Sequence, residues 1–156
     1  MDPTYWSRLN DALLTTGRTL RETPTDGDCF FVAASYFLFG SKGHSKVLRK
    51  LVSFFMNQKE HLMAAQEVAV PQTNFRENLR ELKKSVMMES RSGASSWRGY
   101  LNSLHTTKVF ASDIHIACVA ILFCQKISVA HNFQSGASPI SERLFVPPIV
   151  QPVPVL

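Results

Sequence analysis

Apolar positions recur at helical spacing along most of the chain, which predicts a mainly helical protein. The run at residues 29–38 is apolar on every side and stops before Gly40, which is typical of a buried helix. A second buried helix is expected at residues 113–123, with Ser112 as its cap. Amphipathic helices are expected at residues 3–16, 75–88 and 97–104, and in a helix that Ser45 caps and that turns Val47, Leu48, Leu51, Val52 and Phe55 inward.

Two short segments have the pattern of β-strands. Residues 126–130 place the β-branched Ile127 and Val129 on one side, and residues 144–150 form another candidate strand that two prolines interrupt. Several helices with so few strands predict an α+β fold, in which a small central sheet is flanked by helices. We expect residues 1–146 to form one domain and residues 147–156 to be a proline-rich apolar end, which is a truncated strand.

The composition favours a globular protein with an ordinary core. Of 156 residues, 45% are hydrophobic and 19% are charged, which excludes an acidic disordered chain and a low-complexity chain. The net charge of +5 favours an acidic partner but does not by itself indicate nucleic acid. No apolar stretch reaches the roughly 20 residues of a membrane span, and no apolar leader is visible. We therefore expect a cytoplasmic protein with no membrane partner.

The cysteines agree with that location. Cys29, Cys118 and Cys124 are an odd number, as expected for reduced thiols in the cytosol. Cys118 and Cys124 are expected to be small core residues. A zinc site made from these two cysteines and His115 is disfavoured, because Cys124 falls on another helix face and no fourth ligand is at hand. We expect no metal and no cofactor.

The informative feature is Asp26-Gly27-Asp28-Cys29, at the junction between a loop and the first buried helix. A cysteine in the first turn of a helix lies beside unpaired N–H groups and the positive end of the helix dipole, which favour the nucleophilic thiolate. Gly27 permits a sharp turn that points N–H groups at one spot, as an oxyanion hole requires. Asp26 and Asp28 can cap the helix and hold the loop. The same residues also suit an ordinary Asp-Gly turn before a buried cysteine.

The segment from Asp26 to Phe31, Asp-Gly-Asp-Cys-Phe-Phe, followed by Ala33, resembles the catalytic motif of the ovarian-tumour (OTU) family of cysteine proteases, which are deubiquitinases. Weaker blocks follow in the order of that family. Leu48-Arg49 resembles a Leu-Arg pair of its second helix, Trp97 and Tyr100-Leu101 resemble its aromatic-led segment, and residues 110–129 resemble its buried helix and Ile-x-Val strand. The likeness covers roughly residues 23–129.

This resemblance implies a papain-like fold, with a small central sheet and flanking helices. It makes Cys29 the nucleophile and Asp26 a second catalytic residue, and it makes the backbone of Gly27 and Asp28 the oxyanion hole. The implied reaction is hydrolysis of the isopeptide bond between ubiquitin and a lysine, through a thioester acyl-enzyme. It implies ubiquitin or a ubiquitinated protein as the partner, and no metal, cofactor or nucleic acid.

The general base departs from the pattern of the family. Its members carry a catalytic histidine after the Ile-x-Val strand, near the end of the domain, and none of the five histidines here stands at that place. We expect that the chain is cut off before this histidine, and His131 is the candidate substitute because it ends the Ile-x-Val strand. His115 is expected to pack within its helix and His105 to lie in a loop. Without a base, turnover falls by about four to six orders of magnitude.

Two other functions stay open. A catalytically inactive relative of the family would bind ubiquitin or another protein without using Cys29. A basic adaptor would bind RNA through residues 76–91, where Arg and Lys alternate with Glu. That mixture is more simply a solvated helix face, and the segment has few aromatic residues on which bases could stack.

Overall fold

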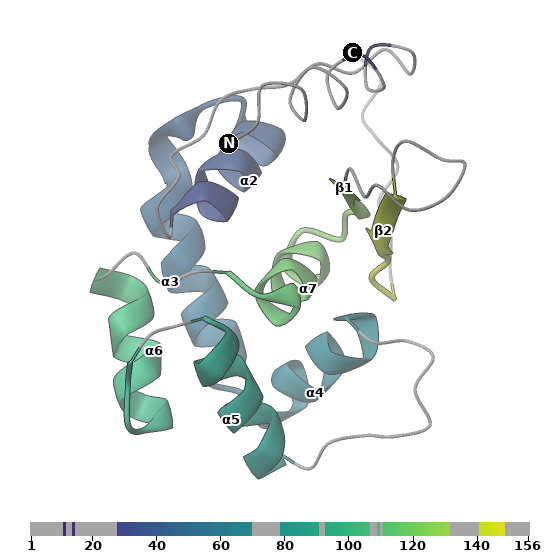
Figure 1. The fold of residues 1–156 in the computed structure, drawn as a ribbon. Helices are drawn as coiled ribbons and strands as arrows, with labels where there is room; N and C mark the ends of the chain where they lie inside the picture. The colour runs from purple at the N-terminus through teal and green to yellow at the C-terminus, as the bar shows by residue number, and fades with distance from the viewer. Residues whose placement is uncertain are drawn as a thin grey trace. The chain divides into compact units, whose positions relative to one another are not determined.

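The structure is a computed structural model that describes residues 28–69, 79–90, 93–106, 111–131 and 141–148, together with Asp11, Leu14 and Val109. These residues form mainly helices (Figure 1). The elements are α2 (Cys29–Phe39), the 3-10 turn η1 (Lys42–His44), α3 (Ser45–Met56), α4 (Lys59–Ala69), α5 (Leu79–Glu89), α6 (Trp97–Thr106), α7 (Asp113–Leu122), β1 (Ile127–His131) and β2 (Ser141–Phe145). β1 and β2 pair as an antiparallel two-stranded sheet, so the described part of the chain belongs to the α+β class.

The chain divides into two compact units. Of the described residues, one unit holds Asp11 and Leu14 together with β1 and with β2 as far as Leu144. The other unit holds all six described helices and the segment that begins at Phe145. Cys29 and most of the other residues singled out in the sequence belong to the helical unit, which is described by itself below.

Helix α3 is the central helix of the helical unit. It packs against α2, α6 and α7, and α4 packs along α7 (Figure 1). The fully buried side chains come from all of these helices and include Phe31, Leu48, Val52, Leu62, Tyr100, Leu104, Cys118 and Val119. Two elements that are distant in sequence, α3 and α6, are therefore held side by side by a shared apolar core.

The two buried helices form where the sequence predicts them. α2 begins at Cys29 and ends at Gly40, whose φ of 72° lies in the left-handed region that glycine adopts without steric cost. α7 is capped by Ser112 as predicted, and the imidazole of His115 completes a reciprocal capping box with the Ser112 backbone. The described part of α2 and α7 confirms the expected boundaries to within a residue.

Helix α3 departs from its predicted orientation. Leu48, Val52 and Phe55 are buried as expected, but Val47 is 50% exposed and Leu51 is 37% exposed. Arg49 and Ser53 are buried instead. The helix is rotated because these two polar side chains find hydrogen-bond acceptors inside the unit, which the apolar pattern alone does not reveal. Ser45 is the first residue of α3, and the capping position belongs to His44.

Other boundaries also differ from the prediction. α4 is not predicted from the sequence, because its buried face includes the small Ala65 and Ala69 and so gives a weak apolar signal. β2 spans Ser141–Phe145 rather than residues 144–150, because Pro147 and Pro148 have no N–H to donate to a ladder. His105 lies in the last turn of α6 and not in a loop.

Some expectations fall on residues that are not described. The helix expected at residues 3–16 is outside the described part except for Asp11 and Leu14, which are helical. Asp26 and Gly27 are outside it as well. None of the described helices has both the length and the apolar character needed to cross a lipid bilayer.

Candidate active site

Cys29 is the first residue of α2 and is partly exposed. The Val32 N–H donates to the Asp28 carbonyl at 3.0 Å, so the amide groups of Cys29, Phe30 and Phe31 precede this bond in the helix. Such N–H groups point out of the N-terminal end of a helix, where the helix dipole is positive. The Cys29 thiol therefore belongs to a helix end whose first backbone N–H groups have no acceptor within the helix.

Asp28 stands at the capping position of α2, but its side chain makes no capping hydrogen bond. Its carboxylate instead accepts a hydrogen bond from Arg49 Nε, with 2.8 Å between Nε and Oδ1. The side chains of Arg49 and Asp28 are 4% and 19% exposed, respectively. Asp28 therefore occupies the expected capping position, but the capping hydrogen bond expected of its side chain is absent, and an ion pair to α3 fixes this residue before Cys29.

Arg49 also donates hydrogen bonds to the C-terminal end of α6 and to the segment that follows it. Its Nη1 donates to the carbonyl of Leu104 at 3.4 Å and to that of Val109 at 3.5 Å. One buried guanidinium thus links the start of α2, the middle of α3 and the chain that follows α6. A buried arginine needs such partners, because an unpaired charge inside a protein is strongly unfavourable.

Phe31 lies between Arg49 and His115. The guanidinium carbon of Arg49 is 4.5 Å from the centre of the Phe31 ring, and the His115 ring centre is 6.3 Å away in an edge-to-face arrangement. Phe31 has no exposed surface, whereas Phe30 is half-buried. Phe31 is therefore the aromatic residue that anchors the first turn of α2 in the core.

His115 is fully buried, as the sequence predicts, and both of its ring nitrogens are engaged. The Ser112 backbone N–H donates to Nδ1 at 2.8 Å, so the proton of the neutral ring resides on Nε2. Nε2 then donates to the Tyr100 hydroxyl. Burial and the nearby charge of Arg49 lower the pKa of His115 to about 3, which keeps the ring neutral.

Tyr100 extends this network toward α5. Burial raises the pKa of its hydroxyl above the ordinary value of 10.0, and the Ser90 side chain opposes part of this rise. The side chains of Tyr100 and Ser90 are both fully buried. These hydrogen bonds link Tyr100 of α6 to His115 of α7 and leave no nitrogen of His115 for proton transfer to Cys29.

The other histidines of the helical unit, His44, His61 and His105, do not contact Cys29 either. His44 precedes α3, its backbone N–H donates to Ser35 Oγ at 3.1 Å, and its ring packs on Phe39. His105 packs against Phe54 and His61 stacks on Phe55. His131 ends β1 in the other unit, and its side chain is not described. The prediction that His131 replaces the general base stays a prediction.

The three cysteines are free thiols. Cys118 is fully buried, and burial raises the pKa of its thiol. Cys124 follows α7 with a φ of 52°, in the left-handed region that residues other than glycine rarely adopt. Within the described ranges, no group of three or more His, Cys, Asp or Glu side chains is placed to hold a metal ion.

Cys29 and Asp28 are identifiable from the sequence as candidate site residues, whereas the bond from Arg49 to Asp28 is not. The signal was weak: a basic residue next to Leu48, followed four positions later by Ser53, on a side of α3 that the apolar residues share. No periodicity could show that its partner lies 21 positions earlier. No protein-family model, curated protein or solved structure matches this chain.

Proposed function

We propose that this protein is a cysteine-type deubiquitinase of the OTU kind, with a papain-like arrangement of its helices and sheet. Cys29 is the nucleophile in this proposal, and the substrate is the isopeptide bond between the C-terminus of ubiquitin and a lysine. Asp26 and the backbone of Gly27 and Asp28 shape the loop that receives the oxyanion.

The observation that carries the proposal is the convergence of the resembling blocks around the start of α2. Asp28 is bonded to Arg49, Phe31 packs on Arg49 and His115, and His115 is bonded to Tyr100. These residues come from the separate blocks that resemble the OTU family. If the likeness arose by chance, there would be no reason for segments so far apart in the sequence to pack together behind the helix end that carries Cys29.

The chemistry follows from the position of the sulfur. The Cys29 thiolate attacks the isopeptide carbonyl, forming a C–S bond while backbone N–H groups bind the developing oxyanion. The C–N bond then breaks, and the lysine amine leaves with a proton from the general acid. Water hydrolyses the thioester and releases the ubiquitin carboxylate. The proton that Cys29 loses must pass to an imidazole, for which His131 is the candidate that the sequence offers.

The decisive experiment uses ubiquitin that carries an electrophile at its C-terminus. The intact protein should gain the mass of one ubiquitin at Cys29, and Cys29→Ala should gain none. Cys124→Ala is the matched control, because Cys124 is also a partly exposed thiol and should leave the adduct unchanged. If the folded protein forms no adduct, or forms it equally after Cys29→Ala, the protease proposal is wrong.

A catalytically inactive ubiquitin-binding module is the second candidate. It is favoured by one observation: none of the described histidine side chains contacts Cys29. This alternative predicts saturable binding in a titration with ubiquitin, no adduct with the electrophilic probe, and equal affinity after Cys29→Ser. An adduct at Cys29 contradicts it, and the absence of both adduct and binding rejects the two candidates together.

A further inference from the structure

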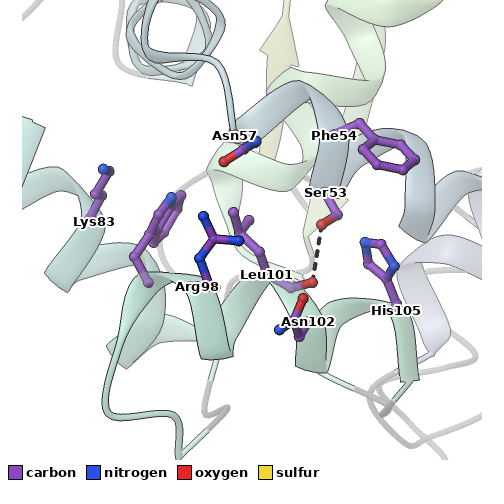
Figure 2. Close-up of a pocket in the computed structure, with 9 residues that line it drawn as sticks. Ser53, Phe54, Asn57, Lys83, Arg98, Leu101, Asn102 and His105 are labelled. Carbon is purple, nitrogen blue, oxygen red and sulfur yellow. Dashed lines mark hydrogen bonds between the residues drawn. The ribbon is translucent and has the colours of Figure 1, made fainter.

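Two pockets lie next to each other on the helical unit, and no residue of α2 lines either of them. The first has a volume of about 500 Å³ and is lined by residues of α3, α5 and α6, among them Phe54, Arg98, Asn102 and His105 (Figure 2). The second has a volume of about 480 Å³ and lies between α5 and the start of α6. Lys83 and Trp97 line both pockets, so they form the wall that the two share.

The described lining of the two pockets is basic. Arg98 lines the first pocket, Arg80 and Lys84 line the second, and Lys83 lines both. His105 adds an imidazole at the far end of the first pocket. No carboxylate is present among the described lining residues of either pocket. A concave surface with several cations and no described anion attracts a ligand with several negative charges.

Aromatic rings are interleaved with these charges. The Lys83 ammonium lies 5.5 Å from the centre of the Trp97 ring, so a cation is held directly beside an indole. At the other end of the first pocket, Phe54 is 64% exposed and its ring meets His105 edge to face at 5.7 Å. Figure 2 shows Arg98 and Asn102 on α6 between the labelled Lys83 and this Phe54–His105 pair.

We propose that these two adjoining pockets bind single-stranded nucleic acid, with one nucleotide in each. Phosphates contact Lys83 and Arg98, one base stacks against Trp97 and a second stacks against Phe54. Single strands require alternating cations and accessible rings, since each base offers a flat face and each phosphate offers a charge. Phe54 is exposed, whereas Trp97 is half-buried and has one neighbour in the Tyr100 ring. Asn57 also lines the first pocket, and its amide group offers a donor and an acceptor to a base edge.

The fold places aromatic side chains from other helices beside the basic side chains of α5. The basic segment at residues 76–91 has few aromatic residues, which argues against base stacking by that segment alone. The packing of α5 against α6 brings Trp97 beside Lys83, and α3 contributes Phe54. An acidic peptide would use the cations but would have no need of the rings, so the observations favour a nucleotide ligand. This inference is independent of the chemistry proposed for Cys29.

The experiment measures the anisotropy of a labelled single strand of about ten nucleotides, titrated with the full chain at several salt concentrations. Binding should weaken with salt, and Lys83→Ala or Arg98→Gln should reduce the slope of log K against log salt by about 0.7 for each phosphate that the variant no longer neutralises. Trp97→Ala should weaken binding by about 5- to 150-fold, and Trp97→Phe should weaken it less. A mononucleotide should compete only weakly if the site spans two nucleotides.

Lys50→Ala is the control matched in charge, because Lys50 is exposed on α3 and lines neither pocket. It should change affinity far less than Lys83→Ala. Arg98→Gln keeps the test decisive even if Trp97→Ala does not fold, because Arg98 is exposed. The proposal is overturned if the single strand does not bind, if a duplex or an acidic peptide of equal charge binds as tightly, or if Lys50→Ala weakens binding as much as Lys83→Ala.

Discussion

Arg49 Nε lies 2.8 Å from Asp28 Oδ1, and this bond ties the residue before Cys29 to the middle of the central helix. Arg49 reaches Asp28 from α3 and reaches two backbone carbonyls at the end of α6 and beyond it. A side chain that satisfies three separated segments sets where the first turn of α2 begins. We therefore regard Arg49 as a positioning residue for Cys29, acting through Asp28 and Phe31.

Replacing Arg49 should destabilise the protein strongly. Arg49→Met removes a buried charge and leaves Asp28 and two carbonyls without this donor, so we expect a loss of about 3–5 kcal/mol of unfolding free energy. Arg49→Lys should recover only part of this loss, because an ammonium cannot reproduce the planar geometry of the guanidinium. Urea unfolding followed by circular dichroism measures both. Lys50→Ala, on the exposed side of α3, should stay within about 0.5 kcal/mol of the parent.

Arg49 also shows which features of the fold could be predicted from the sequence and which could not. The apolar periodicity predicts that α3 is a helix, but it places Val47 and Leu51 inside, where the structure buries Arg49 and Ser53 instead. Arg49 is buried because Asp28 compensates its charge, and this pairing depends on tertiary contact rather than spacing. α2 and α7 were predictable because they are apolar on all sides and carry clear boundary residues, Gly40 and Ser112.

The candidate site was predictable to a similar extent. Cys29 could be identified from the sequence because a Gly turn precedes an apolar helix, and Ser112 could be identified as a helix cap. The closed hydrogen bonding of His115 was not visible, since it depends on Tyr100, 15 positions earlier in the chain. A pattern of residue types cannot tell a histidine whose two nitrogens are occupied from one that is available to move protons.

The rotation of α3 gives a second prediction, from two leucines on one helix. Leu48 is fully buried, so Leu48→Ala should cost about 2–5 kcal/mol through lost burial and the cavity that remains. Leu51 is 37% exposed, so Leu51→Ala should cost clearly less. Chemical unfolding of the two variants compares them directly. Equal costs for the two variants, or a larger cost for Leu51→Ala, would contradict the orientation of α3. The apolar pattern alone turns both leucines inward and therefore allows either of these results.

A third prediction concerns the reactivity of the thiols. In the folded protein, an alkylating reagent should label Cys29 and Cys124, which are partly exposed, and spare Cys118. Cys118 has no exposed surface, and burial raises the pKa of its thiol, so little thiolate is available there to react. Mass spectrometry of peptides after brief labelling gives the extent at each site. Labelling in denaturant should equalise the three cysteines, and protection of Cys29 in the folded state would remove the basis for its proposed role.

The buried state of His115 makes stability depend on pH in a defined window. Its pKa is about 3 in the folded protein against an ordinary value of 6.5, so between these values the unfolded chain binds more protons than the folded one. The unfolding free energy should therefore rise as the pH increases from about 3 to about 6.5 and gain nothing more from His115 above that window. The contribution of this residue to the slope is at most about 1.4 kcal/mol per pH unit.

Carboxylates also titrate at low pH, so the test compares two proteins rather than reading one curve. His115→Gln removes the titrating ring. Because the parent loses the contribution of His115 as the pH falls from 6.5 toward 4, the difference between the unfolding free energies of the two proteins should narrow over this range. If the variant does not fold, the His115 ring resonances of the parent provide the same information. They should stay constant between pH 7 and pH 4.5 while the protein is folded, because the Ser112 and Tyr100 bonds hold the neutral ring in place. A titration of these resonances near pH 6.5 would show that the imidazole is open to solvent, and it would make His115 a candidate for the general base of the proposed reaction.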